Sequence, residues 1–259
     1  MNNNFTICVL LYGDFPKLAE RCLSSIIQTL PDIGSNLRIG MNAVSRETLD
    51  VVRKIGTGLL SASAENIHKY PMMRHMLYGE NRITTPYTMW FDDDSYLLKQ
   101  SDGDIWLKAI EAQMEQADML GSIYWIKWRG QQREFVKAQP WYGGKDPAAS
   151  NSIRFATGGW WVIRTEILYQ LNYPWPSLDH RGGDVMLGEA CRQQDLRLVT
   201  YKNSSVCINA DDRGRESKSP RRGFDQPPIG MTFEPDKADT LDVVTPLPTP
   251  PVHRKIVEL

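Results

Sequence analysis

The chain has 259 residues, 41% of them hydrophobic, which is enough to bury a sizeable core; we favour one α/β domain with appendages over two small domains. Its 30 Lys and Arg residues nearly balance 31 Asp and Glu residues. The formal net charge of -1 excludes a protein that is drawn onto nucleic acid or an acidic membrane by its overall field.

The cysteines and the start of the chain bear on its compartment. No C-x-x-C pair or nearby His has metal-ligand spacing, so neither a zinc site nor a disulfide framework is predicted. The first residues lack the basic and apolar regions of a signal peptide, and no segment offers the roughly 20 apolar residues of a membrane span. We expect a soluble, cytoplasmic protein with core thiols at Cys8, Cys22, Cys191 and Cys207.

The first third of the chain alternates strand and helix patterns. Residues 5–12 form a continuous apolar and β-branched run, as a buried parallel strand does. Residues 16–30 carry apolar side chains at helical spacing after Pro16, and a strand over 37–41 and a helix over 46–55 repeat this order. A further helix is predicted over 70–78. This alternation predicts βαβ units and a mostly parallel sheet.

Three consecutive aspartates follow the next apolar run, 88–91, as if delivered at the carboxyl end of a central strand. Adjacent carboxylates repel one another and are costly to desolvate unless a cation or hydrogen-bond donors compensate. Asp92, Asp93 and Asp94 therefore favour a site for Mg²⁺ or Mn²⁺, which would bridge a substrate diphosphate. The alternative is a solvated turn, because short acidic motifs often match by chance.

The remaining pattern gives a helix over 105–119, strands over 120–128, 155–163 and 196–201, and a helix over 185–194. Residues 131–152 are a polar connection that contains Pro and Gly. Beyond residue 210 charge, Gly and Pro dominate. We therefore predict one domain over 1–210 and a loop-rich tail or lid over 211–259.

Paired glycines and paired tryptophans lie together in the predicted strand over 155–163. Gly158 and Gly159 allow the backbone to approach a ligand closely, and the indoles of Trp160 and Trp161 offer flat faces for sugar rings. The alternative is a β-bulge whose indoles fill the core. Since neighbours in a strand face opposite sides, a place in the core is the stronger alternative for Trp161 and the weaker one for Trp160.

One carboxylate precedes the helix predicted over 185–194. Asp184 follows two glycines and could act as a general base. An ordinary helix N-cap, which satisfies orphan backbone amides, explains the residue equally well. Its combination with the other two motifs favours catalysis.

Taken in order, these segments resemble the nucleotide-sugar glycosyltransferases of the GT-A fold, over residues 5–199. The R-C-L-S-S-I run at 21–26 is similar to the start of glycosyltransferase family 2. The central motifs are similar to Fringe-like glycosyltransferases, whose D-D-D-x-Y, F-A-x-G-G and acid–apolar-x-apolar-G patterns match 92–96, 155–159 and 184–188. The resemblance implies a mixed, mostly parallel sheet flanked by helices.

The resemblance also assigns roles to residues. It makes Asp94 a metal ligand together with Asp92, places Asp92 and Asp93 near the ribose or the metal's water shell, and makes Asp184 the base. Residues 158–161 would contact the acceptor. Tyr12 and Asn42, at the ends of the first two predicted strands, would lie near the nucleoside of the donor. Lys69 and Arg74, in the segment before the acidic strand, would contact its diphosphate or base, and an exposed helix face is their ordinary alternative.

Two departures from the Fringe-like pattern affect the site. An acidic pair is replaced by Gly183-Asp184, and a late metal-binding His is replaced by the N-A-D-D run at 209–212. The third metal ligand is therefore open, with Asp211 and His253 as weak candidates.

The implied activity is metal-dependent glycosyl transfer from a nucleoside-diphosphate sugar, with a UDP-sugar in first place, to an acceptor hydroxyl, with inversion. A retaining mechanism, a non-catalytic glycan-binding domain and a nucleotidyltransferase are the alternatives. The last usually opens with a glycine-rich phosphate loop, which residues 12–16 do not form. The acceptor is open between a glycan, a lipid-linked group and nucleic acid. One interpretation of the basic cluster over 213–222 is that it steers a phosphate-bearing acceptor to the site. The alternative is an ordinary solvated loop.

Overall fold

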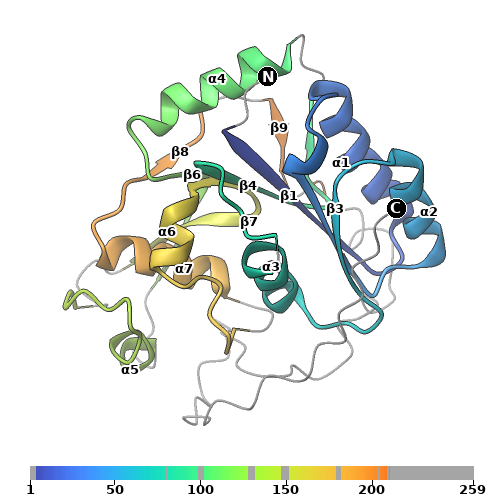
Figure 1. The fold of residues 1–259 in the computed structure, drawn as a ribbon. Helices are drawn as coiled ribbons and strands as arrows, with labels where there is room; N and C mark the ends of the chain where they lie inside the picture. The colour runs from blue at the N-terminus through green and yellow to red at the C-terminus, as the bar shows by residue number, and fades with distance from the viewer. Residues whose placement is uncertain are drawn as a thin grey trace.

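The computed structural model describes residues 4–79, 81–98, 102–127, 132–146, 152–178, 182–202, 205–208 and 210. Strands and helices alternate along the first half of the chain (Figure 1). The strands are β1 (Phe5–Tyr12), β2 (Leu37–Asn42), β3 (Leu59–Ser63), β4 (Tyr87–Asp92), β5 (Tyr96–Leu97), β6 (Met119–Lys127), β7 (Ser152–Arg164), β8 (Leu198–Thr200) and β9 (Val206–Cys207). The helices are α1 (Pro16–Thr29), the 3₁₀ helix η1 (Gly34–Asn36), α2 (Arg46–Ile55), α3 (Lys69–Tyr78), α4 (Gly103–Met114), α5 (Gln132–Lys137), α6 (Thr165–Gln170) and α7 (Gly183–Gln193).

A seven-stranded sheet in the order β3-β2-β1-β4-β7-β6-β8 organises the molecule, beside a two-stranded sheet of β5 and β9. The strands from β3 to β4 are parallel, and β7 runs antiparallel between β4 and β6. Every residue of β1 is buried, which agrees with its continuous apolar run. The predicted mixed, mostly parallel sheet is confirmed.

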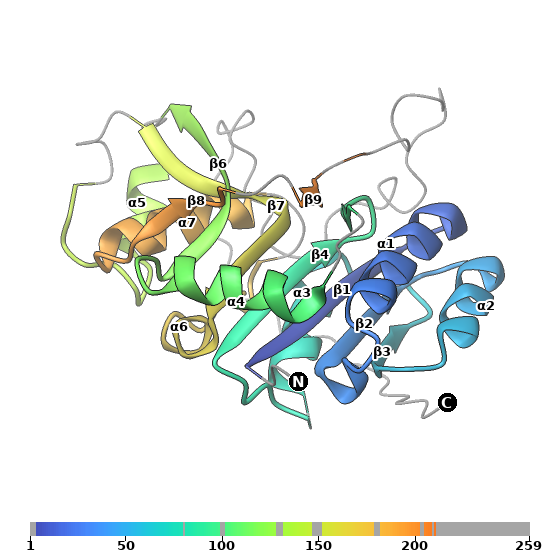
Figure 2. The ribbon, with the colours of Figure 1, turned by 90° about the horizontal axis from the view of Figure 1, so that it is seen from above.

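Apolar side chains form a core on each face of the sheet. One core contains side chains of α1, α2 and α4, and the other contains side chains of α3, α5, α6 and α7. Helices therefore flank both faces, as Figure 2 shows from above. The parallel strands β1 and β4 are neighbours, so their carboxyl ends meet at one edge of the sheet.

The boundaries differ from the sequence prediction in a few places. The predicted helix over 105–119 ends at Met114, because the chain enters β6 at Met119. The predicted strand over 155–163 is a 13-residue strand, and its pairing with β6 shifts register between Gly121 and Ile123. The strands β3, β5 and β9 and the helices α5 and α6 were not predicted.

The compartment predictions have mixed outcomes. Cys8, Cys22 and Cys191 are free and buried, as core thiols should be, and Cys207 is free and half-buried. Within the described ranges, no helix has the length and apolarity needed to cross a bilayer. A cytoplasmic location stays a prediction, and the predicted tail over 211–259 lies outside the described residues.

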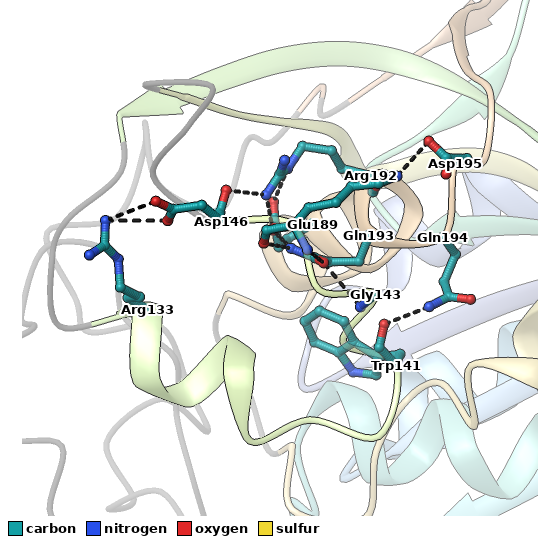
Figure 3. A network of polar contacts seen from close by, with 10 residues as sticks. Arg133, Trp141, Gly143, Asp146, Glu189, Arg192, Gln193, Gln194 and Asp195 are labelled. Atoms are coloured by element: carbon teal, nitrogen blue, oxygen red, sulfur yellow. Dashed lines mark hydrogen bonds and ion pairs between the residues drawn. The ribbon is translucent and has the colours of Figure 1, made fainter.

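A polar network joins the segment after α5 to α7 (Figure 3). The Glu189 carboxylate is fully buried and accepts hydrogen bonds from Arg192 and Gln193, both at 2.7 Å. Oε1 of Gln193 accepts the amides of Gly143 and Lys145, at 3.0 and 3.1 Å. The network thus anchors α7, whose first turn carries Asp184.

Candidate active site

The three aspartates lie where β4 ends, at the carboxyl edge of the parallel strands. A hydrogen bond of 2.9 Å from the Ser95 amide to the Asp92 carbonyl closes the turn. Asp93 and Asp94 are 2% and 4% exposed. The Ala210 amide donates to the Asp94 carbonyl at 2.9 Å, so the chain returns to this turn after β9.

Asp92 is held by two protein donors. Nε1 of Trp90 donates to its Oδ1 at 2.9 Å, and Nζ of Lys69 lies 2.7 Å from its Oδ2. The same ammonium donates to the Gly158 carbonyl at 3.0 Å. This arrangement brings β4, α3 and β7 to one point and makes Asp92 the anchor of Lys69.

The ammonium of Lys69 is nearly enclosed, with 14% of its side chain exposed. Burial lowers the pKa of Lys69, but the carboxylates of Asp92 and Asp184 outweigh that effect, so the net shift is upward. Lys69 therefore stays a cation between two carboxylates at neutral pH.

Asp184 joins this cluster from the first turn of α7. The Tyr70 hydroxyl donates to Oδ1 of Asp184 and accepts the Asp184 amide at 3.1 Å. A Cβ placed on Gly158 would lie 2.7 Å from Oδ2 of Asp184 and 2.6 Å from Nζ of Lys69, so the missing side chain makes room for both groups. The helix N-cap is Gly182, with φ of 77°, and it makes no side-chain cap bond. The alternative that Asp184 is an N-cap is therefore wrong.

Asn42 and Tyr12 lie at the ends of β2 and β1, as predicted. The Asn42 side chain is 1% exposed; it donates to Oδ1 of Asn66 and accepts the Ile67 amide, both at 2.9 Å. Its amide therefore shapes the loop that leads into α3 and Lys69. Tyr12 is 8% exposed, with its ring 6.2 Å from that of Phe15. A nucleoside contact stays a prediction for both.

Arg74 is not part of the cluster. Its guanidinium donates to Oδ1 of Asn172 at 3.0 Å and to the Pro174 carbonyl at 2.7 Å, and it lies over the Tyr78 ring at 4.3 Å. These contacts tie α3 to the segment after α6. These contacts give Arg74 a structural role, and its predicted donor contact stays a prediction.

The prediction that the two indoles offer stacking surfaces for a sugar is wrong, because both rings are buried. Trp160 is fully buried and packs against Phe91 and Tyr201, with centroids 6.4 and 4.7 Å apart. Trp161 is 2% exposed and stacks on Trp90 in the opposite core at 5.8 Å. Period-two alternation sends the two indoles into the two cores, where they cannot stack on a sugar.

The neighbouring glycines were predicted to contact the acceptor as well. Gly158 lies beside Lys69 and Asp184, and its contact with an acceptor stays a prediction. Gly159 is buried, and its contact with an acceptor stays a prediction.

Sequence reasoning missed Tyr70. It follows Lys69 directly and was predicted only as the start of a helix. The motifs flanking Asp184 contain no signal for it, because 114 positions separate the two residues. Gly183 is the one residue near Asp184 that points to Tyr70. A Cβ at this position would lie 2.2 Å from Cζ of Tyr70, so the ring fits against α7 only because residue 183 is a glycine.

Carboxylates such as those of the turn after β4 are the ligands that a divalent cation such as Mg²⁺ takes in proteins. Among the described residues, no three His, Cys, Asp or Glu side chains form a metal-binding group. Mg²⁺, however, is commonly held by one or two carboxylates together with substrate phosphates and water. The local field is negative: burial, and then Asp93 and Asp94, raise the pKa of the Cys22 thiol well above its usual value. The weak candidates Asp211 and His253 lie outside the described residues.

The fold is that of the GT-A-type glycosyltransferases, as similar solved structures show. The mannosyltransferase PcManGT from Pyrobaculum calidifontis, in complex with GDP-Man and Mn²⁺, has a TM-score of 0.54 at 16% identity, over 82% of this chain and 58% of that one. TarS from S. aureus has 0.52 at 13%, over 78% and 59%. GalNAc-T7 with UDP, GalNAc and Mn²⁺ has 0.57 at 11%, over 79% and 43%.

This chain therefore spans less than two thirds of the length of each of these structures. No protein-family model matches the sequence, and no similar sequence is found among curated proteins. The likeness establishes the fold. A closer relation to glycosyltransferase family 2 or to Fringe-like enzymes stays a prediction.

Proposed function

We propose that this protein is a metal-dependent glycosyltransferase that moves a sugar from a nucleoside-diphosphate sugar to an acceptor hydroxyl with inversion. One observation carries the proposal. In a GT-A fold, the acidic turn after β4, the Lys69 ammonium and the Asp184 carboxylate converge on the glycine backbone at Gly158. Ligands of open α/β sheets bind at this carboxyl edge.

The donor binds at the turn formed by 92–95. Asp94 would hold the cation together with Asp92, whose two oxygens also accept hydrogen bonds from Lys69 and Trp90. When bound, Mn²⁺ or Mg²⁺ neutralises the charge that develops on the departing diphosphate. Lys69 keeps Asp92 in place and adds a second positive charge beside that leaving group.

Asp184 is the base. The acceptor oxygen forms a bond to the anomeric carbon as the bond from that carbon to the diphosphate oxygen breaks, and the hydroxyl proton passes to Asp184. Tyr70 occupies Oδ1, so Oδ2 beside Gly158 is the oxygen that faces the reacting groups. Attack opposite the leaving group inverts the anomeric centre.

UDP-sugars and GDP-sugars are the donors to test first, because GalNAc-T7 is described with UDP and PcManGT with GDP-Man. The non-catalytic alternative, a domain that recognises a glycan through Trp160, Trp161 and Trp141, loses support because all three indoles are buried. The acceptor remains an unspecified hydroxyl compound.

The direct test is release of nucleoside diphosphate from UDP-GlcNAc and GDP-Man with Mn²⁺. We expect Asp184→Asn to lower kcat by roughly 10²–10⁴-fold and to leave donor affinity unchanged. Asp195→Asn is the matched control: Asp195 follows α7 with its side chain 87% exposed, and kcat should be unchanged. Equal turnover by Asp184→Asn and wild type would refute the assignment of the base. Retention at the anomeric carbon, measured by NMR, would refute inversion.

A further inference from the structure

Tyr70 is a buried tyrosine whose hydroxyl makes two bonds to one residue. It lies on α3, is 2% exposed, donates to Oδ1 of Asp184 and accepts the Asp184 amide. Both bonds end on the residue proposed as the base. A hydroxyl that bonds both the side chain and the backbone of one residue restricts the rotation of that side chain.

We propose that Tyr70 is a positioning residue that fixes the Asp184 carboxylate for proton abstraction. The inference rests on the proposed function and adds a residue to it. With Oδ1 held, Oδ2 is directed to the space left by the missing side chain of Gly158. A misplacement of about 1 Å in such a group can lower the rate about 100-fold.

Two glycines make this arrangement sterically feasible. Gly183 admits the Tyr70 ring beneath α7, where a Cβ would meet Cε1 and the hydroxyl oxygen at 2.6 Å. Gly158 leaves room on the opposite side of the carboxylate. The Asp184 side chain therefore lies between the Tyr70 ring and the backbone of Gly158, and the Tyr70 hydroxyl fixes the orientation of its carboxylate.

The phenol is a permanent donor. Burial, and then the Asp184 carboxylate, raise the pKa of Tyr70 well above its usual value, so the hydroxyl keeps its proton at neutral pH. Tyr173, which is 1% exposed, packs its ring edge-on against that of Tyr70, with the centroids 6.1 Å apart. The Tyr70 ring is therefore held by the Tyr173 ring as well as by its fit against Gly183.

The variant Tyr70→Phe removes the hydroxyl and keeps the ring. We expect kcat for donor hydrolysis, with UDP-GlcNAc or GDP-Man and Mn²⁺ as probes, to fall about 10- to 100-fold while the donor KM is unchanged. Tyr169→Phe is the matched control. Its hydroxyl bonds the carbonyls of Leu77 and Ile83 at 3.1 and 2.9 Å, so its loss should lower stability and leave kcat unchanged.

A second readout needs no turnover. In protein labelled with ¹³C at aspartate carboxyl carbons, the Asp184 resonance is the one missing from Asp184→Asn. We expect it to shift in Tyr70→Phe and to stay in place in Tyr169→Phe. If Tyr70→Phe does not fold, Gly183→Ala supplies the test, because its Cβ would lie 2.2 Å from Cζ of Tyr70 and would displace the hydroxyl from Asp184.

The outcomes separate this inference from the proposed function. A shifted resonance and a lower kcat at constant KM support positioning. An unshifted resonance, or wild-type kcat in Tyr70→Phe, overturns it, even if Asp184→Asn is inactive. If the resonance shifts but the wild-type protein hydrolyses neither donor, the result supports the hydrogen bond between Tyr70 and Asp184. It overturns the catalytic role of that bond together with the proposed function.

Discussion

The Nζ atom of Lys69 lies 2.7 Å from Oδ2 of Asp92, with 14% and 22% of the two side chains exposed. This enclosed ion pair joins the start of α3 to the end of β4. Removing one member of such a pair leaves an uncompensated charge, which costs more than the pair itself contributes.

We therefore expect Lys69→Met to lower the free energy of unfolding by about 2 kcal/mol in urea titrations. The control is Lys54→Met, because the Lys54–Glu20 pair lies 3.3 Å apart with side chains 78% and 52% exposed, and its loss should cost at most about 0.5 kcal/mol. The double variant Lys69→Met/Asp92→Asn should recover part of the loss. An equal loss of unfolding free energy in the two Lys→Met variants would show that the enclosed pair is no more important for stability than the exposed pair.

Two tryptophans should differ sharply in their effect on stability. Trp161 is 2% exposed and stacked on Trp90, whereas Trp125 is 66% exposed on β6. We expect Trp161→Ala to cost about 3–5 kcal/mol of unfolding free energy, and Trp125→Ala to stay within about 0.5 kcal/mol. Calorimetric melting distinguishes them. A stable Trp161→Ala variant with weakened sugar binding would restore the stacking role.

Acid stability should depend on Asp118, which precedes β6. Hydrogen bonds from Arg197, followed by its charge and that of Arg164, hold the pKa of Asp118 below its usual value despite burial. A lowered pKa in the folded state stabilises the protein above the unfolded value, about 3.9, and the benefit is lost as the pH falls through the folded pKa.

The stability gap between wild type and Asp118→Asn should therefore be widest above about pH 4 and should close in more acidic solution. Arg197→Gln should flatten the same limb of the stability curve. Parallel curves for wild type and Asp118→Asn at every pH would contradict the linkage.

The network around α7 should control local opening of the chain after α5. Oε1 of Gln193 accepts the amides of both Gly143 and Lys145, so Gln193→Ala removes the one acceptor that the two amides share. We expect hydrogen exchange of these two amides to accelerate at least about tenfold, with β1 unchanged. In the control, Gln113→Ala, the effect should be limited to the Lys202 amide, which Gln113 accepts at 3.1 Å. Unchanged exchange at Gly143 would show that other contacts hold this segment.

Local patterns predict the centre of this fold well. The buried run of β1 and the helix over 46–55, capped by Ser45, depend on neighbours in sequence and were found at the predicted bounds. The two-residue strands β5 and β9 escape such patterns, since each exists only through its partner about 110 positions away. The order β4-β7-β6 depends on packing between distant segments, so no local pattern reveals it.

The site divides in the same way. Asp92, Gly158 and Asp184 were predicted from local motifs and Lys69 from the family resemblance, and the fold brings the four together. The donor contact of Arg74 stays a prediction and the stacking role of Trp161 was wrong, because a side chain gives the same local pattern whether it binds a ligand or a neighbouring segment. Their partners, Asn172 and Trp90, are known only from the fold.

The role of Asp94 as the anchor of metal and nucleotide can be measured by thermal unfolding with UDP, GDP, CDP or dTDP, each with Mn²⁺ and then with EDTA, on wild type and Asp94→Ala. We predict that one diphosphate stabilises the wild type in Mn²⁺ alone, by about 2.7 kcal/mol at 100 times its Kd, and that Asp94→Ala loses this effect. Stabilisation by none of the four, or an equal effect in Asp94→Ala, would contradict the account.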